Sequence, residues 1–176
     1  MFNFFKKNDS HYSIYAKFAS LSRNENLYIK FKVPDTIDGR YEMLMVNIIL
    51  IIRRLKKEKD DNLSQLVLDL MFSDIDQALR ESGVGDLSVP KRMKKIGEAF
   101  YGRISSLDKI LQSKYLNNEL VNYFKRNTFC DSNAHDIECE RLSEYTINMI
   151  HFLDSLTLDK IIENSYVFPD SIWMKN

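Results

Sequence analysis

Glycine, proline and cysteine are scarce in this chain of 176 residues, which contains five Gly, three Pro and two Cys. A many-stranded sandwich or barrel needs turn residues at short, regular intervals, so the low Gly and Pro content argues against that fold class. Two cysteines do not make a disulfide framework. The most apolar stretch, residues 43–52, is shorter than the roughly 20 residues of a membrane-spanning helix. We therefore expect neither a β-rich fold nor a membrane span.

An excess of charge of either sign is also lacking, because 25 Lys and Arg residues balance 25 Asp and Glu residues. A protein without an overall basic field is not drawn to a polyanion as a whole, and we expect no DNA partner. Hydrophobic residues at 44% and charged residues at 28% are typical of a globular protein. The sequence predicts a single domain over residues 1–176, since no repeat or linker divides it.

Apolar residues recur with a helical period along nearly the whole chain. The pattern predicts an all-α fold, a single compact multi-helix domain with an apolar and basic N-terminal arm at 1–9 and an aromatic tail at 164–176. An extended connector is expected at 26–34, where Val33 precedes a proline. The expected helices are one capped by Ser10, one starting near Gly39 with Asp35 and Asp38 as caps, and segments at 63–83, 90–111, 116–127, 138–156 and after 158.

Two of the expected helices have distinctive faces. The helix starting near Gly39 is apolar almost all round, which is typical of a helix at the centre of a core. The helix opened by Pro90 carries a clean apolar stripe that includes Phe100, a residue we expect in the core. Tyr101 is rotated by about 100° from Phe100 on a helix. It is expected at the edge of the stripe, where an amphipathic ring still reaches water or a partner.

Motifs for catalysis or cofactor binding are missing from the sequence. There is no Glu-x-x-His pair, no His-Glu-x-x-His and no phosphate-binding loop. Gly83-Val-Gly85 is a fragment of a dinucleotide loop, but a helix C-cap followed by a tight turn is the better interpretation. We expect no enzyme, no cofactor and no bound metal. Two interpretations remain for Cys130, His135, Cys139 and His151. One is a metal site, although the closely spaced cysteine pair that is typical of zinc sites is missing; the other is that the two cysteines are ordinary thiols.

The helical pattern breaks between residues 71 and 103. Phe72 falls on the polar side of its helix, while Asp74 falls inside the apolar stripe. One interpretation is an exposed Phe72 that meets a partner and a buried Asp74 tied to a cation. The other is a helix break at Ser73, with Ser73-x-x-Asp76 as a variant capping box. Both interpretations remain open at this point.

A basic cluster occupies the first turn of the helix opened by Pro90, and it comprises Lys91, Arg92, Lys94 and Lys95. The dipole of a helix disfavours cations at that end, so the cluster suggests an acidic partner, RNA phosphate or a lipid headgroup. The alternative is a solvated face paired with nearby acids, namely Asp76, Glu81, Asp86 or Glu98. We expect the Asp86 carboxylate to accept backbone N–H groups at this helix start.

Two longer stretches are more specific than any single motif. They are MFSDIDQALRESGVGDLSVPK at 71–91, continuing to GEAFYGR at 97–103, and VPDTIDGRYE at 33–42. Together they resemble the ubiquinol–cytochrome c chaperone family, across most of residues 18–127. The resemblance implies an all-helical, non-enzymatic assembly chaperone for the cytochrome bc1 complex. The mitochondrial member is similar to a holdase that binds newly made cytochrome b near the ribosomal exit, together with a small partner protein.

The resemblance also implies where partners bind. An apolar surface around Phe72, Phe100 and Tyr101 is expected to receive the nascent client, while the basic cluster faces ribosomal RNA, acidic lipid or a partner. The residues expected to bind a client or partner are Phe72, Asp76, Arg80, Asp86, Lys91, Arg92, Lys94, Lys95, Tyr101 and Arg103. Those expected to be structural are Asp74, Gly83, Gly85, Pro90 and Phe100.

The N-terminus bears on where the protein acts. It has neither a secretory apolar region nor a mitochondrial transit peptide, so the chain is similar to the bacterial form and is expected at the cytoplasmic face, with peripheral membrane contact. Residues 2–7, with three Phe and two Lys, would dip weakly into an anionic surface or else fold onto the domain. Two rival hypotheses remain: a ribosome- or membrane-surface adaptor that acts through its basic patch, and a helical small-molecule or metal-binding protein.

Overall fold

The fold of the chain is known from a computed structural model that describes residues 2–58, 61–130 and 135–173. Within these ranges the secondary structure is helical, with no strand, and the expected all-α class is confirmed. The helices are α1 (Phe2–Leu21), α2 (Glu25–Ile29), α3 (Ile37–Lys57), α4 (Asp61–Glu81), α5 (Val89–Ile110), α6 (Leu116–Asn127), α7 (Asp136–Ser155), α8 (Leu158–Ile162) and the 3₁₀ helix η2 (Asp170–Trp173).

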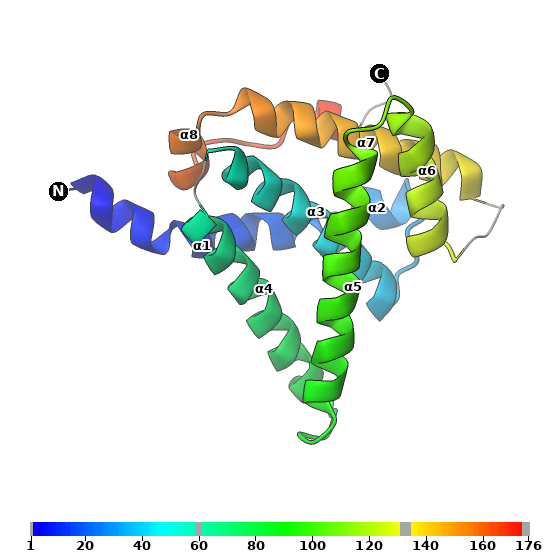
Figure 1. The fold of residues 1–176 in the computed structure, drawn as a ribbon, viewed down its shortest axis with the longest axis horizontal. Coiled ribbons are helices and arrows are strands. Elements are labelled where there is room, and N and C mark those ends of the chain that lie inside the picture. The colour runs from blue at the N-terminus through cyan, green and yellow to red at the C-terminus, as the bar shows by residue number, and fades with distance from the viewer. Residues whose placement is uncertain (1, 59–60, 131–134, 174–176) are drawn as a thin grey trace.

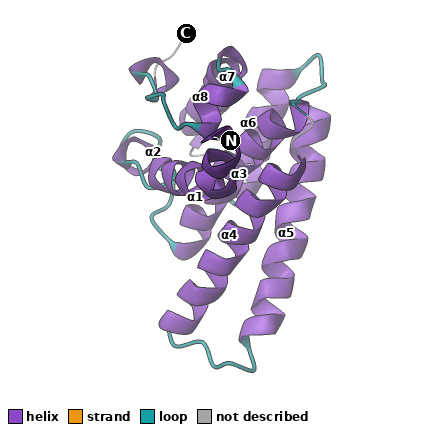
Figure 2. Ribbon diagram, turned by 90° about the vertical axis from the view of Figure 1, so that its left-hand side faces the viewer, coloured by secondary structure: helices purple, strands orange, loops and turns teal. Residues whose placement is uncertain are grey.

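The helices form a body from which one long helical hairpin projects. Helices α4 and α5 make the hairpin, and the loop that joins them lies at the end farthest from the body (Figures 1 and 2). Helix α3 lies in the middle of the body and contacts α1, α4, α5 and α7. The base of the hairpin therefore packs on the core, while its tip extends away from it.

Helix α3 supplies the centre of the hydrophobic core. All residues from 43 to 52 are buried, including a polar one, Asn47. The Asn47 side chain accepts a hydrogen bond from the Tyr145 hydroxyl at 2.6 Å and donates one to Ser22 Oγ at 3.1 Å. Because a buried amide without partners would be costly, these two bonds fix the register of α3 against α1 and α7.

The C-terminal tail packs through its aromatic rings over residues 164–173, as the sequence predicts. Phe168 meets Phe18 of α1 edge to face at 5.5 Å, and Trp173 stacks on Tyr145 of α7 at 5.1 Å. The Lys17 ammonium lies 3.9 Å from the centre of the Tyr166 ring, a cation–π contact. The tail thus closes the body between α1 and α7.

The caps predicted for the first two long helices are wrong. Helix α1 begins at Phe2, so Ser10 is a buried residue inside the helix and not its cap. Thr36, and not Asp35 or Asp38, caps α3, since its hydroxyl accepts from the Gly39 N–H at 3.2 Å. Asp35 instead pairs with Arg40 at 2.6 Å. The side chains of residues 2–7, proposed to touch a membrane, lie outside the described part of the structure.

The connector predicted as extended at 26–34 contains a short helix. The Asn24 side chain accepts from the Asn26 N–H at 3.0 Å and so starts α2. Farther along, the helix boundaries agree better: α6 covers the predicted 116–127, and α7 begins two residues before the predicted 138. In the described ranges no helix combines the length and the apolar character that crossing a membrane requires.

Gly39 has a packing role that composition alone does not reveal. A Cβ built at this position would lie 2.1 Å from the Pro34 carbonyl oxygen, well inside van der Waals contact. Only glycine lets the strand-like approach around Val33 fold this closely onto the first turn of α3. The 33–42 stretch is therefore a tight corner that delivers α3 to the core.

Candidate functional site

The α4–α5 hairpin turns at Gly83, the glycine with a positive φ, +83°. The N–H of Val84 donates to the Leu79 carbonyl, and the N–H of Gly83 donates to the Arg80 carbonyl. This pair of bonds is the Schellman motif that commonly ends helices, and glycine is favoured at its left-handed position. The C-cap predicted at Gly83 is confirmed.

The acidic residues near the tip bind Arg80 and not the helix start. Arg80 Nε lies 2.6 Å from Asp76 Oδ2, and its Nη1 lies 2.9 Å from Asp86 Oδ1. Asp86 is 87% exposed in its side chain, and no backbone N–H of α5 donates to it, so the predicted cap is wrong. Ser88 stands at the N-cap position, also without a side-chain cap bond, and Pro90 occupies the first turn as expected.

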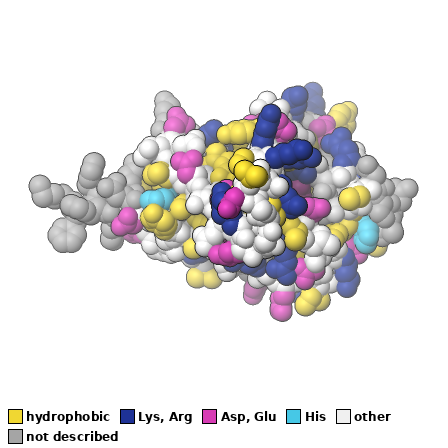
Figure 3. Space-filling view, turned by 90° about the horizontal axis from the view of Figure 1, so that it is seen from below, with side chains coloured by type: hydrophobic (Ala, Val, Ile, Leu, Met, Phe, Trp, Pro, Cys, Tyr) yellow, Lys and Arg dark blue, Asp and Glu magenta, His cyan; other side chains and the backbone are white. Residues whose placement is uncertain are grey.

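The tip of the hairpin is basic and apolar at once. We call Lys91, Arg92, Lys94 and Lys95 the basic turn, and all four are exposed. Of the acids proposed as their partners, only Glu98 approaches, 4.0 Å from Lys94, while Asp76 and Asp86 face Arg80. Leu87, just before the basic turn, is 98% exposed. Viewed from the side of the tip, Figure 3 shows hydrophobic side chains beside a group of Lys and Arg side chains.

A row of three aromatic rings lies across the hairpin. Phe100 is fully buried and contacts Phe72 at 5.6 Å and Tyr101 at 5.8 Å, both edge to face. Tyr101 is 59% exposed, as the helical rotation predicts. Phe72 is half-buried, so the prediction of an exposed Phe72 is wrong in degree: Phe100 shields one side of its ring. The row connects the core to the surface.

The apolar stripe of α5 is only partly covered. Its stretch near the core is buried at Leu107 and Ile110, but toward the tip Met93, Ile96 and Ile104 are only partly buried. The helical period of the sequence identifies this stripe but does not show how much of it other helices cover. The partly buried Phe72, Met93, Ile96 and Ile104, together with the exposed Tyr101, form what we call the hairpin face.

Asp74 has a cation, Arg23, at 4.0 Å, as one of the two sequence interpretations predicts, but it is not buried. Helix α4 continues through Ser73, so the helix break is wrong. Asp74 is half-exposed, not buried, and accepts a hydrogen bond from the Tyr15 hydroxyl at 2.5 Å, with Arg23 at 4.0 Å. Burial, and then the bond to Asp74, raises the pKa of Tyr15, which keeps this phenol a donor. Asp74 therefore joins α4 to α1.

Arg103, expected to bind a partner, faces inward. Its Nε donates to Glu42 Oε2 at 2.8 Å, and the Tyr123 hydroxyl donates to Glu42 Oε1, also at 2.8 Å. Burial raises the pKa of the Glu42 carboxyl, although Arg103 and Tyr123 act in the opposite direction. Sequence reasoning missed Glu42 and Tyr123, because a single acid or phenol on an apolar helix gives no local sign of its partner.

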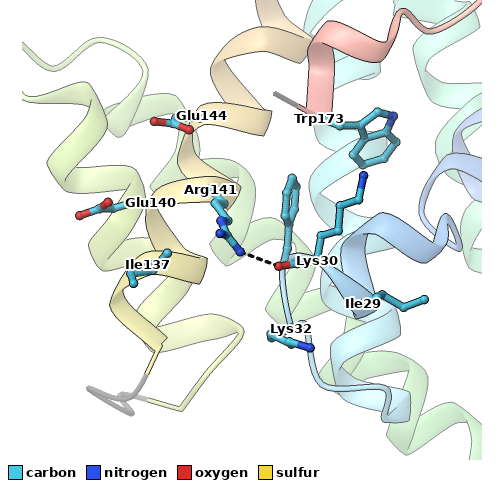
Figure 4. A pocket seen from close by; sticks show the side chains of 9 residues that line it. Ile29, Lys30, Lys32, Ile137, Glu140, Arg141, Glu144 and Trp173 are labelled. Atoms are coloured by element: carbon cyan, nitrogen blue, oxygen red, sulfur yellow. Dashed lines mark hydrogen bonds between the residues drawn. The ribbon is translucent and has the colours of Figure 1, made fainter. Parts of the chain in front are cut away.

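A pocket lies away from the hairpin. It measures about 490 Å³ and is bounded by the end of α2, the start of α7 and Trp173. Figure 4 shows Arg141 directed at the backbone of Lys30, whose carbonyl accepts its Nη1 hydrogen bond at 2.9 Å. Charges of both signs line it, with Lys30, Lys32 and Arg141 against Glu140 and Glu144. None of the residues singled out from the sequence contributes to it.

The cysteines and histidines do not form a ligand cluster in the described ranges. Cys139 is buried and burial raises the pKa of its thiol to about 11, which disfavours the thiolate that metals and electrophiles need. Cys130 is exposed, and the His135 ring stacks on Phe129 at 4.6 Å. No group of three His, Cys, Asp or Glu side chains suited to a metal ion occurs among the described residues.

These features define a class: an all-helical binding protein whose projecting hairpin offers an incompletely covered apolar face behind a basic tip. The comparisons agree. Residues 30–168 match the family described as ubiquinol-cytochrome C chaperone. The structure is similar to the crystal structure of the Cbp3 homolog from Brucella abortus, with a TM-score of 0.82 and 31% sequence identity over 94% of this chain and 92% of that one. No curated protein matches the sequence.

The chain therefore belongs to the ubiquinol–cytochrome c chaperone family. It is a non-enzymatic assembly factor for ubiquinol–cytochrome c reductase, the cytochrome bc1 complex. Both sequence stretches that carry the resemblance, at 33–42 and 71–103, lie inside the matched residues. The structure gives them physical roles: the first is the corner before α3, and the second is the hairpin with its turn, its basic tip and its aromatic row.

Proposed function

We propose that this chaperone holds newly made cytochrome b, through the hairpin face, until the subunit is assembled. The observation that carries the proposal is the partly buried apolar stripe that runs from Phe72 to the exposed Tyr101, anchored on the buried Phe100. A membrane-spanning segment outside a bilayer is apolar on every side and needs an apolar surface to cover it. Side chains such as Met93, with an unbranched and adaptable chain, suit a surface that must accept a segment not yet folded.

The chemistry of holding a client is binding without covalent change. Release requires a moderate affinity, and a face of partly buried side chains leaves only part of each apolar surface to be covered by a client. Because the rings of Phe72 and Tyr101 are already oriented by Phe100, little side-chain freedom is lost when a client segment lies across them. The aromatic row at the centre of the hairpin face is thus preorganised, whereas the side chain of Met93, toward the tip, can change its conformation to fit a client.

A second part of the proposal concerns location. We infer that the protein works at the cytoplasmic face of the membrane, near the ribosome, with a small partner protein beside it. The basic turn supports this part, since exposed cations, of which only Lys94 has a carboxylate within 4.0 Å, favour an anionic surface. The residues proposed to take part in partner contacts near the tip are Asp76, Arg80, Asp86, Lys91, Arg92, Lys94 and Lys95.

A gene deletion with complementation tests the proposal. We expect the deletion strain to lose assembled cytochrome bc1 complex and its b-type haem absorbance, and the wild-type gene to restore both. A Phe72→Ala/Tyr101→Ala gene should restore neither fully, whereas Tyr115→Ala should do so. Tyr115 is a matched control, 71% exposed at the start of α6, outside the hairpin face. Full restoration by the double variant, at equal protein level, would move the client surface elsewhere.

The adaptor hypothesis makes a different prediction for the same strains. If the basic turn mattered more than the hairpin face, a variant with Gln at Lys91, Arg92, Lys94 and Lys95 would fail to restore the complex, while Phe72→Ala/Tyr101→Ala would succeed. Binding of the purified protein to ribosomes would then fall steeply with added salt, as counterion release requires.

A further inference from the structure

We propose that the tip of the α4–α5 hairpin inserts into the surface of an anionic lipid bilayer, with Leu87 in the acyl boundary and the basic turn among the headgroups. The inference rests on the proposed function, because it places the hairpin face where a client segment leaves or enters the membrane. It assigns a specific surface and a specific partner chemistry to the tip.

The geometry of the tip is the first argument. The turn after Gly83 lies at the end of the hairpin farthest from the body, so a flat surface can approach it without meeting other helices (Figures 1 and 2). Leu87 is 98% exposed, more than any other large hydrophobic residue of the described chain. Its neighbour Val89 is fully buried, so the turn folds inward on one side and directs an aliphatic side chain outward on the other. A leucine gains most from leaving water at such a position.

The charge around Leu87 is the second argument. The acid next to it, Asp86, is held by Arg80, which also holds Asp76. In the described part of the chain, no carboxylate lies within ion-pair distance of Lys91, Arg92 or Lys95, and Lys94 has only the distant Glu98. Four exposed cations, of which only Lys94 has a carboxylate within 4.0 Å, therefore follow closely behind an exposed aliphatic side chain. This combination suits an interfacial anchor on anionic lipid, where each signal alone binds weakly.

The same cations would suit RNA phosphate, and Leu87 is what favours lipid. Single-stranded RNA is gripped mainly by aromatic rings on which successive bases stack; the basic turn offers a single guanidinium plane, Arg92, and the aliphatic Leu87 offers none. The exposed ring of the hairpin, Tyr101, lies about three helical turns behind Lys91, far from the tip. An aliphatic side chain ahead of four cations matches the layered polarity of a membrane surface better than a polynucleotide.

The orientation that results links the tip to the hairpin face. With Leu87 at the bilayer surface, Met93 and Ile96 follow within the next turns of α5, and the Phe72–Phe100–Tyr101 row lies beyond them. An apolar segment near the membrane would then meet a continuous apolar path from the acyl boundary to the aromatic row. The tip would act as the docking point and the hairpin face as the holding surface.

Vesicle sedimentation of the purified full chain tests the proposal without any client. The probes are phosphatidylcholine vesicles with and without phosphatidylglycerol, at low and raised salt. The variants are Leu87→Ser and a quadruple change of Lys91, Arg92, Lys94 and Lys95 to Gln. Matched controls outside the tip are Ile137→Ser, an aliphatic residue 62% exposed on α7, and Lys109→Gln/Lys114→Gln. Leu87 is almost fully exposed, so its replacement leaves the fold intact.

We expect wild-type protein to bind the anionic vesicles and not the neutral ones. The partition constant should fall about tenfold for Leu87→Ser and at least about 100-fold for the quadruple variant, while the controls bind as wild type. Equal binding by wild type and Leu87→Ser would overturn the proposal. The proposal would also be overturned if the protein bound ribosomes and if the quadruple change abolished that binding while Leu87→Ser left it intact. That pattern would assign the tip to RNA. If the protein captures cytochrome b but does not bind vesicles, the lipid-insertion proposal is wrong and the proposed function stands. If it binds vesicles but does not capture cytochrome b, the proposed function is wrong and the lipid-insertion proposal stands.

Discussion

Arg103 of α5 and Glu42 of α3 form an ion pair, 2.8 Å between Nε and Oε2, that ties the hairpin to the centre of the core. The Glu42 side chain is almost fully buried, and Tyr123 of α6 donates to its other oxygen. One carboxylate thus joins three helices at the point where the hairpin leaves the body. The hairpin is fixed at its base, and its tip and face are left free for partners.

The first prediction is the pH dependence that Glu42 gives to stability. Burial raises its pKa above the ordinary value of 4.5 in the folded protein, so folding favours the protonated form. The stabilisation from Glu42 is then fully present below pH 4.5 and is lost as the pH rises through the folded-state pKa. Denaturant unfolding of wild type and Glu42→Gln at several pH values measures the effect.

We expect the free energy of unfolding of wild type, minus that of Glu42→Gln, to decrease from about pH 4 toward pH 7. The ion pair alone would give the opposite sign, since it stabilises the charged carboxylate. A difference that grows with pH would therefore show that Arg103 outweighs burial at this site.

The second prediction separates the two neighbouring rings of α5. Phe100→Ala should lower the free energy of unfolding by about 3–5 kcal/mol, the usual cost of truncating a fully buried aromatic residue. Tyr101→Ala should change it little, because that ring is 59% exposed. Chemical denaturation of both variants provides the comparison, and equal losses would contradict the assigned positions.

The third prediction distinguishes the two glycines of the turn. Gly83 has φ +83° and needs a left-handed conformation, so Gly83→Ala should cost about 1–2 kcal/mol. Gly85 has no positive φ, and a Cβ there meets nothing within 4 Å, so Gly85→Ala should be tolerated. Thermal melts of the two variants are the measurement. A Gly85→Ala loss as large as that of Gly83→Ala would mean that the loop closes in another geometry.

The fourth prediction concerns Asp86. Since its carboxylate pairs with the exposed Arg80 and caps no helix, Asp86→Ala should leave the denaturant midpoint unchanged. A drop of about 1 kcal/mol in stability, which is typical of a lost helix cap, would contradict this placement.

Much of the fold follows from local pattern. The boundaries of α6, the C-cap at Gly83, the first turn at Pro90 and the opposite burial of Phe100 and Tyr101 all come from spacing and from residues with one strong conformational preference. Such preferences act within a few residues, so the sequence displays them directly.

The errors arise where several partners compete for one polar group. Asp74 bonds Tyr15, which is 59 residues away, and Asp86 bonds Arg80 in place of the helix start. Thr36 caps α3 although two aspartates stand beside it. These choices depend on which side chain the tertiary fold brings near, and one sequence does not contain that distance information.

The stretch of sequence that contains the candidate site could be found from its pattern, but the exposure of its individual side chains could not be predicted. The stretch 71–103 departs from a regular helical pattern in the sequence, and in the structure it spans the second half of α4, the Gly83 turn and most of α5. Met93 and Ile96 are only partly buried because the body does not extend along the whole hairpin, and the helical period of the sequence does not predict where the body ends. The same is true of Leu87, an ordinary loop residue in the sequence and the most prominent aliphatic side chain at the tip.

Site-specific photocrosslinking to newly synthesised cytochrome b tests the central claim most directly. A photoreactive side chain at position 101, in the hairpin face, should give a crosslink to cytochrome b, and the same group at position 115 should give none, although Tyr101 and Tyr115 are 59% and 71% exposed. The position-101 crosslink should disappear when Phe72→Ala is added, with the melting temperature of the doubly substituted protein checked against that of the 101 variant. Crosslinks of equal strength at 101 and 115, or at 115 alone, would contradict the assignment of the hairpin face as the client-binding surface.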